Sequence, residues 1–449
     1  MACLKKPLLT SSELQRTLQH PLLRPRTHIL TVPFFLLSLF LLSASYTTNS
    51  TNTTTTLTSS NSHITLSSQS QRNTFSTVTA AERTRENSTN NSCDIFDGSW
   101  IQDDSLEPIY QHGSCPFLDD AFNCFKNRRS DFEFLKYRWK PHGCEIPRFD
   151  GLKMLNMLRG KRVVFVGDSL NRNMWQSLVC ALRSSLKDKS KSRIYQVSGR
   201  REFRIQGFFS FKFKDYGCSI DFVKSPFLVQ EWKVLRKDGA SVSLQRETLR
   251  LDMIQASKSL YHNADIIIFN TGHWWNHDKT KNGRNYFQEG NHVYEKLQVS
   301  EALRKALKTW AKWVDSKVDS RKTRVFFTGF SASHYKGGQW NSGGKCDGER
   351  QPITNESYLG AYPWTMGIVE EVIAEMKTPV FYLNITKMTD YRKDGHPSIY
   401  REAGFNDNRG HKMVQDCSHW CLPGIPDSWN QLLYATLLMA QTHFLTSTN

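Results

Sequence analysis

Two motifs, far apart in the chain, together hold a serine, a histidine and a carboxylate. Residues 167–170 read Gly-Asp-Ser-Leu, and Asp416-x-x-His419 lies near the end of the sequence. A serine hydroxyl becomes an effective nucleophile when a histidine takes its proton and a carboxylate orients that histidine. These residue types therefore suit acyl transfer through an ester of Ser169. The tetrapeptide alone also forms ordinary turns, so the interpretation depends on the distant Asp-x-x-His motif.

The sequence around the serine predicts a strand, a sharp turn and a helix. The apolar run 163–166 is typical of a buried strand, and a helix is expected over 172–185. A serine on the turn between them can face solvent and the N–H groups that open the helix. Asp168 suits the helix cap, because its carboxylate can accept hydrogen bonds from those N–H groups.

Further apolar runs predict the rest of an α/β fold. Strands are expected at 162–166, 264–270, 324–329 and 379–384, and helices at 172–185, 250–262, 296–316, 360–376 and 428–443. Continuous apolar strands separated by helices favour a parallel sheet with helices on both faces. Alternating apolar residues between 203 and 230 predict an antiparallel insertion. The first fifty residues from Cys93 predict loops and short strands joined to the core by disulfides.

Polar sequence follows three of the predicted strands. Ser169 follows the first, the segment 270–275 follows the second, and the segment 329–334 follows the third. Ligands of such sheets bind at the carboxyl ends of the strands, so we expect the site there. An acyl transfer also needs donors for the oxyanion. Candidates for those donors or for the pocket wall are Gly167, Asp168, Arg172, Asn270 and His273.

Four histidines compete for the role of base. His419 has Asp416 three residues before it, and one turn of chain would aim both side chains at the same point. Cys417 and Cys421 flank His419 and could hold that turn through disulfides.

The other three histidines have weaker claims. His396 follows Asp394 in an Asp-Gly-His-Pro sequence that is typical of a turn. We interpret His334 and His396 as surface or hydrogen-bonded residues, and His273 as part of the pocket.

The first 92 residues predict no folded core. Residues 1–28 are polar and basic, and residues 29–45 are almost wholly apolar. The apolar run fits either a cleaved signal peptide or a signal anchor, and the long basic leader favours the anchor, with 1–28 in the cytosol. Residues 46–92 are rich in Ser, Thr and Asn and predict a lumenal stalk. We assign the folded domain to residues 93–446.

Sequons and cysteines favour a lumenal location for that domain. Glycosylation candidates are Asn49, Asn52, Asn87, Asn90, Asn355 and Asn384. Nine of the ten cysteines follow the apolar run, too scattered for a metal site, so we expect no metal, several disulfides and one unpaired thiol, Cys218. The net charge of +17 fits an acidic polymer or simply a basic surface, and we expect no nucleic-acid partner.

Five motifs resemble those of the plant trichome birefringence-like proteins, which are polysaccharide O-acetyltransferases related to SGNH/GDSL esterases and carry a PC-esterase domain. The matching segments are 139–144, 147–149, 166–173, 270–275 and 416–430. The basic leader, single apolar segment and stalk match as well. The resemblance covers essentially the whole folded part, and its long C-terminal motif is very specific.

The resemblance implies an SGNH-hydrolase-like sheet in a single-pass type II protein of the Golgi membrane, with its catalytic domain in the lumen. It gives Ser169 the role of nucleophile, Asp416 that of orienting carboxylate and His419 that of base. It also implies four disulfides: Cys93–Cys144, Cys115–Cys180, Cys124–Cys421 and Cys346–Cys417.

The resemblance implies that an acetyl group passes through acetyl-Ser169 to a hydroxyl of pectin, xylan or mannan. No bound cofactor is expected, and the acetyl donor is acetyl-CoA or another acetyl carrier. The same three residues would serve an acetylesterase, since the two reactions differ only in whether water or sugar reaches the acyl-enzyme. A non-catalytic pectin-binding wall protein is a third interpretation. The resemblance favours transfer.

Overall fold

The computed structural model describes residues 93–190, 193–198, 207–238, 241–401 and 414–446, and a seven-stranded sheet lies at the centre of this part. Its strand order is β13-β12-β9-β3-β6-β5-β4. The strands are β3 (Arg162–Gly167), β4 (Ile194–Ser198), β5 (Phe208–Phe213), β6 (Cys218–Lys224), β9 (Ile266–Phe269), β12 (Arg324–Thr328) and β13 (Val380–Leu383). The five strands from β13 to β6 run parallel, and β5 and β4 extend the sheet through antiparallel pairs. The predicted parallel α/β sheet is confirmed.

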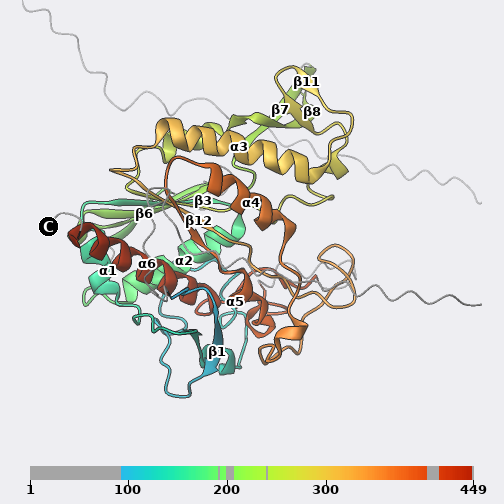
Figure 1. The fold of residues 1–449 in the computed structure, drawn as a ribbon. Coiled ribbons are helices and arrows are strands. Elements are labelled where there is room, and N and C mark those ends of the chain that lie inside the picture. The colour runs from blue at the N-terminus through green and yellow to red at the C-terminus, as the bar shows by residue number, and fades with distance from the viewer. Residues whose placement is uncertain (1–92, 191–192, 199–206, 239–240, 402–413, 447–449) are drawn as a thin grey trace, which may run out of the picture. The chain divides into compact units, whose positions relative to one another are not determined.

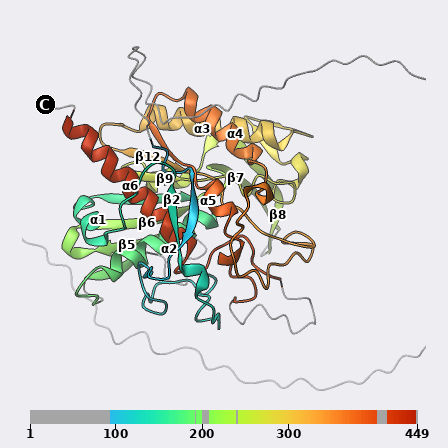
Figure 2. The same ribbon diagram turned by 60° about the horizontal axis from the view of Figure 1, so that its bottom comes forward.

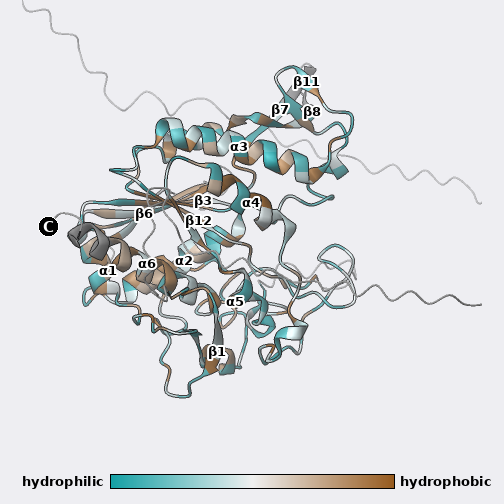
Figure 3. Ribbon diagram, in the orientation of Figure 1, coloured by the Kyte–Doolittle hydropathy of each residue, from teal (hydrophilic) through white to brown (hydrophobic). Residues whose placement is uncertain are grey.

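Helices cover both faces of this sheet (Figure 1). One face carries α1 (Gly151–Met157), α2 (Ser169–Ser184) and α6 (Ile425–Thr446), and the other carries α3 (Val299–Lys317) and α4 (Trp364–Glu375). Side chains of a strand alternate between its faces. Val163 and Phe165 of β3 therefore join the first group of helices, and Val164 and Val166 join the second. Figure 3 shows hydrophobic colour concentrated in the central strands and hydrophilic colour on much of α3.

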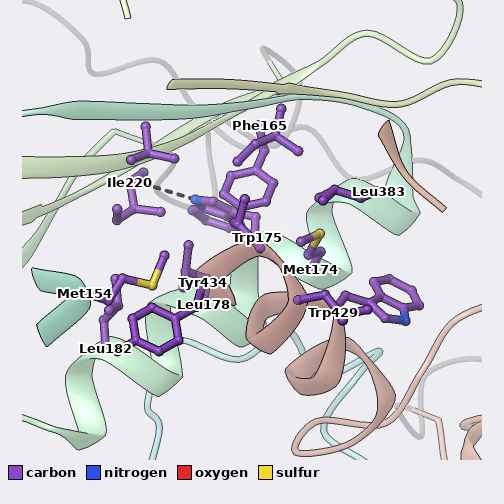
Figure 4. Packing of buried hydrophobic residues seen from close by; sticks show 14 of the residues in the cluster. Met154, Phe165, Met174, Trp175, Leu178, Leu182, Ile220, Leu383, Trp429 and Tyr434 are labelled. Carbon is purple, nitrogen blue, oxygen red and sulfur yellow. Dashed lines mark hydrogen bonds between the residues drawn. The ribbon is translucent and has the colours of Figure 1, made fainter. Parts of the chain in front are cut away.

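Packing beneath the sheet holds α2 in place. Figure 4 shows Met154 of α1, Leu178 of α2 and Tyr434 of α6 close together, and all three are at most 2% exposed. The indole N–H of Trp175 donates to the carbonyl of Ile220 in β6, at 3.1 Å. Because Ser169 is the first residue of α2, this packing also fixes where the serine lies.

A second sheet replaces one predicted helix. Its order is β11-β10-β8-β7, from β7 (Val229–Asp238), β8 (Ser241–Ile254), β10 (Phe287–Glu289) and β11 (His292–Val293). The helix predicted over 250–262 is wrong, because β8 continues to Ile254 and a short 3-10 turn, Ala256–Leu260, follows. Leu249 and Leu251 are buried while Arg250 pairs with Asp252, which is the two-residue alternation of a strand.

The predicted antiparallel insertion needs a correction too. β5 and β6 are antiparallel, as expected, but β6 lies directly beside β3 and parallel to it. The segment is therefore part of the central sheet rather than an addition to it. Ile220 and Phe222 face one helix layer and Val223 faces the other, which explains why β6 is apolar on both faces. The part of the prediction before residue 207 lies outside the described residues.

The segment before α1 is a disulfide-linked unit with little regular structure, as predicted. β1 (Gly98–Gln102) pairs with β2 (Tyr137–Pro141), and Figure 2 shows this pair beside α5 (Thr386–Asp390). The indole N–H of Trp100 donates to the carbonyl of Met388 at 2.7 Å. The N-terminal unit is thereby tied to the C-terminal part of the domain.

No helix within the described part of the chain is long and apolar enough to cross a membrane. The apolar segment 29–45 and the stalk 46–92 lie outside the described residues.

Candidate active site

Ser169 lies at the point where β3 ends and α2 begins. Asp168 caps the helix, with its carboxylate accepting from the backbone N–H of Leu170 at 2.9 Å. The backbone N–H of Asp168 donates to Oδ1 of Asn270 at 3.0 Å. A Cβ on Gly167 would overlap that same Oδ1, so glycine is required here for the close approach of the Asn270 side chain.

His419 and Asp416 form a row with this serine. Nε2 of His419 lies 2.7 Å from Oγ of Ser169, and Nδ1 lies 2.8 Å from Oδ2 of Asp416. The other oxygen of Asp416 accepts from the backbone N–H groups of Ser418 and His419, at 3.2 and 3.0 Å, so the carboxylate also closes the turn. The geometry lets His419 take the serine proton while Asp416 fixes which ring nitrogen carries hydrogen.

The charge of Asp416 is strongly favoured. Burial by itself would raise its pKa, since only 5% of the residue is exposed. The nearby His419, its hydrogen bonds and the guanidinium of Arg401 outweigh burial and bring the pKa well below the usual range. Nε of Arg401 lies 3.9 Å from Oδ2. Asp416 is therefore ionised across the physiological range and ready to stabilise a protonated His419.

A second carboxylate network lies directly beside the serine. Asn270 donates to Oδ1 of Asp168 at 2.8 Å, and Nδ1 of His273 lies 3.1 Å from Oδ2. Nε2 of His273 lies 2.9 Å from the carbonyl oxygen of Ser331, and its ring stacks on Phe330 with centroids 4.1 Å apart.

The surroundings of Asp168 and His273 favour the charged form of each partner. Burial opposes charge on both partners, yet their attraction and hydrogen bonds lower the pKa of Asp168 and raise that of His273. The NH2 group of Asn270 has two N–H bonds, and Asp168 uses one of them, so the other can serve as an oxyanion donor.

Arg172 belongs to the wall of the site rather than to the row. Its guanidinium pairs with Asp119 and lies over the rings of Phe122 and Phe209. Phe122 in turn contacts the ring of His419, with centroids 5.5 Å apart. The contact partners of Arg172 thus favour support of the base over contact with an oxyanion.

The competing histidine pair, His396 with Asp394, is not formed. Asp394 makes a buried ion pair with Arg392 at 2.8 Å, while Nδ1 of His396 lies 2.7 Å from the carbonyl oxygen of His419. His334 contacts His396 at 2.7 Å. Both are hydrogen-bonded residues, in agreement with their interpretation from sequence, but they lie against residues 416–421 rather than on the surface. We call 416–421 the base segment, because it carries His419, the candidate base.

One contact that holds the base segment was not predicted. The side chain of Asn173 accepts from the backbone N–H of Trp420 at 2.8 Å and donates to its carbonyl at 3.2 Å. Asn173 is wholly buried in α2. A buried amide among apolar helix positions was the available signal, but the sequence could not show which distant segment it binds.

The described cysteines pair as the resemblance implied. The four disulfides are Cys93–Cys144, Cys115–Cys180, Cys124–Cys421 and Cys346–Cys417, and Cys218 is a buried free thiol. Burial raises the pKa of Cys218 to about 12, so this thiol is unreactive. Two of the disulfides end on either side of His419 and restrain the segment that carries it.

Of the glycosylation candidates, Asn355 is exposed and Asn384 is half-buried; Asn49, Asn52, Asn87 and Asn90 lie outside the described residues. Within the described part, no group of three or more His, Cys, Asp or Glu side chains could hold a metal ion.

Two family models match the chain. The model described as the GDSL/SGNH-like acyl-esterase family found in Pmr5 and Cas1p covers residues 146–436, which include all three residues of the row. The model of the PMR5 N-terminal domain covers residues 91–145. The boundary between the two models falls just after the disulfide-linked unit, before α1.

Curated proteins of Arabidopsis thaliana are similar to this chain over most of its length. Protein trichome birefringence-like 4 is 64% identical over 355 residues, which are 78% of this chain and 76% of that protein. Protein trichome birefringence is 55% identical over 350 residues, 78% of this chain but only 56% of that protein. Protein trichome birefringence-like 38 is 40% identical over 350 residues, 77% of this chain and 84% of that protein.

Proposed function

The chain belongs to the GDSL/SGNH-like acyl-esterase family and to its trichome birefringence-like members, and from this premise we propose that it is a polysaccharide O-acetyltransferase. The family makes it an enzyme of acyl transfer or ester hydrolysis. The observation that carries the finer proposal is the row in which Ser169, His419 and Asp416 are joined by contacts of 2.7 and 2.8 Å.

The first half-reaction acetylates the serine. His419 takes the proton of Ser169 as the hydroxyl oxygen attacks the carbonyl carbon of an acetyl donor. The tetrahedral oxyanion is stabilised by the backbone N–H of Ser169 and by the amide of Asn270. Collapse of this intermediate breaks the bond to the carrier, which leaves with the proton from His419, and acetyl-Ser169 remains.

The second half-reaction transfers the acetyl group. A sugar hydroxyl gives its proton to His419 and attacks acetyl-Ser169, and the new tetrahedral intermediate releases the serine, which recovers its proton from His419. Asp416 stabilises the charged imidazolium in both halves without itself being protonated. The acceptors we propose are pectin, xylan or mannan, and the donor is acetyl-CoA or another acetyl carrier. We place the enzyme in the Golgi membrane, with the domain in the lumen.

Hydrolysis is the second candidate, because the matching family model is described as an acyl-esterase family. The same row of residues serves both reactions. The difference lies only in whether water or a sugar hydroxyl accepts the acetyl group.

The test uses the full-length protein with an acetyl donor and each polymer in turn. NMR locates new acetyl groups on the polymer, and mass spectrometry detects acetyl-Ser169 when no acceptor is present. Ser169→Ala should remove the adduct and lower transfer by at least about 1,000-fold, while Ser259→Ala, an exposed serine, should leave transfer unchanged. Asp416→Asn should be damaging but less complete than Ser169→Ala, because the base is misoriented rather than deleted.

Three other results would replace the proposal. Acetate release without polymer acetylation would make the protein an esterase. Transfer by Ser169→Ala at the wild-type rate would refute the mechanism. Binding of pectin by every variant, with no acetyl chemistry even in wild type, would make it a wall-binding protein.

A further inference from the structure

Two histidines that take no part in the row are hydrogen-bonded to each other beside it. His334 lies beyond the end of β12, and His396 follows the short turn Lys393–Gly395. Nδ1 of His334 lies 2.7 Å from Nε2 of His396. Nδ1 of His396 lies 2.7 Å from the backbone carbonyl oxygen of His419, and Nε2 of His334 lies 2.8 Å from that of Asp390.

The hydrogen count of this chain of contacts decides its charge. A carbonyl oxygen only accepts, so each outer nitrogen must carry hydrogen to bond it. The two inner nitrogens also need one hydrogen between them, since two bare lone pairs repel. Three ring hydrogens are therefore required, but two neutral imidazoles carry only one each. The contacts are satisfied together only when His334 and His396 hold one extra proton.

We propose that His334 and His396 form a proton-sharing pair with a single positive charge. The pair positions the backbone of His419, and its charge opposes protonation of the His419 ring. The proposed role rests on the proposed function, because it assumes that His419 is the base. The charge state itself does not. Both histidines are positioning residues in this proposal, because they act through His419 and touch no substrate.

The surroundings favour one charge and exclude two. The carboxylate of Asp390 on α5 lies 3.6 Å from Nε2 of His334, and the ring of Trp420 stacks on His396 with centroids 4.1 Å apart. A cation over an indole face is stabilised. His396 is only 3% exposed, and burial together with the charge of His334 lowers its pKa to about 3. A second proton is thereby excluded near neutrality.

Three further charged or titratable groups lie near the pair: Asp416, His419 and Arg129. Asp416 attracts its charge and a protonated His419 repels it. Arg129 donates to the carbonyl of His396 at 3.1 Å, but its own charge is paired with Asp131. Loss of the extra proton at higher pH leaves two ring hydrogens for three contacts, so the pair then loses one of them: the contact to His419, the contact to Asp390 or the contact between the two rings.

The hydrogens can be counted without any substrate. Full-length protein labelled with 15N-histidine should give three ring N–H signals from the pair near pH 6, and two once the extra proton is lost at higher pH. His334→Gln and His396→Gln identify those signals, and His262→Gln, at an exposed histidine, should remove none of them. Two signals at pH 6, with both rings neutral, would overturn the proposal whether or not the protein transfers acetyl groups.

The effect on the base is read from the pH dependence of Ser169 acetylation. His334→Gln removes the charge but leaves His396 able to donate to His419. The midpoint of its acid limb should move upward by about one pH unit, because the positive charge of the pair no longer opposes protonation of His419. His396→Leu should lower the rate at the plateau, and His396→Gln should restore most of it. A lower plateau with an unmoved midpoint in His334→Gln would mean a purely structural role and refute the electrostatic one.

Discussion

Asn270 combines three tasks in one side chain. Its oxygen accepts from the backbone N–H of Asp168, its nitrogen donates to the carboxylate of Asp168, and the amide occupies the space where a side chain on Gly167 would lie. The turn that presents Ser169 and the proposed oxyanion donor are thus adjusted by the same contacts. Small changes at Gly167 should consequently act on chemistry more than on the fold.

Gly167→Ala tests this coupling. The added methyl group must displace the amide of Asn270, and the loss of one oxyanion donor typically costs about 10²–10³ in rate. We expect acetylation of Ser169 to fall by roughly that factor, with the chain still folded. Gly367→Ala is the matched control, because that helical glycine has open space around it and should keep full activity. Equal rates for both variants would contradict the coupling.

Asp427 should make stability depend on pH. It is buried at the start of α6, where it contacts Ser177 at 2.5 Å and accepts from the N–H of Gly424 at 2.8 Å. Burial raises its pKa to about 6, above the value of about 4 in an unfolded chain. The protonated acid therefore favours the fold, and this contribution is complete below pH 4 and is lost as the pH rises through 6.

Asp427→Asn isolates the effect. Its urea-unfolding free energy, subtracted from that of wild type at each pH, should give a difference that falls by roughly 2–3 kcal/mol between pH 4 and pH 7. A constant difference over that range would show that folding does not raise the pKa of this carboxyl.

The residues of the row could be predicted because their chemistry is local to short motifs. Ser169 follows a recognisable strand, and Asp416 lies three residues before His419. The supporting contacts could not be predicted, because each joins distant segments: Asn173 binds Trp420, and His396 binds the carbonyl of His419. A polar residue at a buried position predicts a hydrogen bond, but the sequence does not show which distant residue forms it.

At the scale of elements, the four strands with continuous apolar sequence could be predicted, and each lies in the parallel sheet. β6 and β8 were harder. β6 carries the buried Asp221, paired with Arg162, inside an apolar strand, and β8 mixes charged and apolar residues in a way that also fits a helix. β6 was expected as a strand of an antiparallel insertion, and only its pairing with β3 places it in the central sheet. For β8, the pairing with β7 decides that the segment is a strand.

The two disulfides that flank the base should affect catalysis as well as stability. Cys421→Ser and Cys124→Ser break the same disulfide, so both should lower the activity by the same factor. In either variant, the segment that carries His419 is restrained by one disulfide instead of two. Each loss should also cost about 2–5 kcal/mol of stability.

Cys93→Ser provides the comparison. It breaks the bridge to Cys144, which restrains the N-terminal unit rather than the base segment. We expect comparable destabilisation, measured by thermal unfolding, but a wild-type rate of Ser169 acetylation below the unfolding temperature. A rate loss as large as that of Cys421→Ser would show that the disulfides matter only for folding.

At the scale of the whole molecule, the prediction concerns sidedness. The basic leader, the apolar segment 29–45 and the stalk sequons predict that residues 46–449 face the lumen. Protease added to intact Golgi vesicles should remove only a short N-terminal piece, and detergent should expose the rest. Degradation of the whole protein without detergent would place the domain in the cytosol, where its disulfides would be hard to maintain.

Ser169 and His419, the proposed nucleophile and base, are 250 residues apart in sequence, with the serine first. At a synthesis rate of about 5–20 residues per second, Ser169 emerges roughly 10–50 s before His419. The delay is longer still for the disulfide of Cys124, whose partner Cys421 lies 297 residues later in the chain. Under the proposed mechanism, the serine of a nascent chain is therefore inert, and the protein cannot act while it is being made. In genetic terms, a premature stop codon anywhere before position 416 leaves no partial activity, so such alleles should behave as complete losses of function.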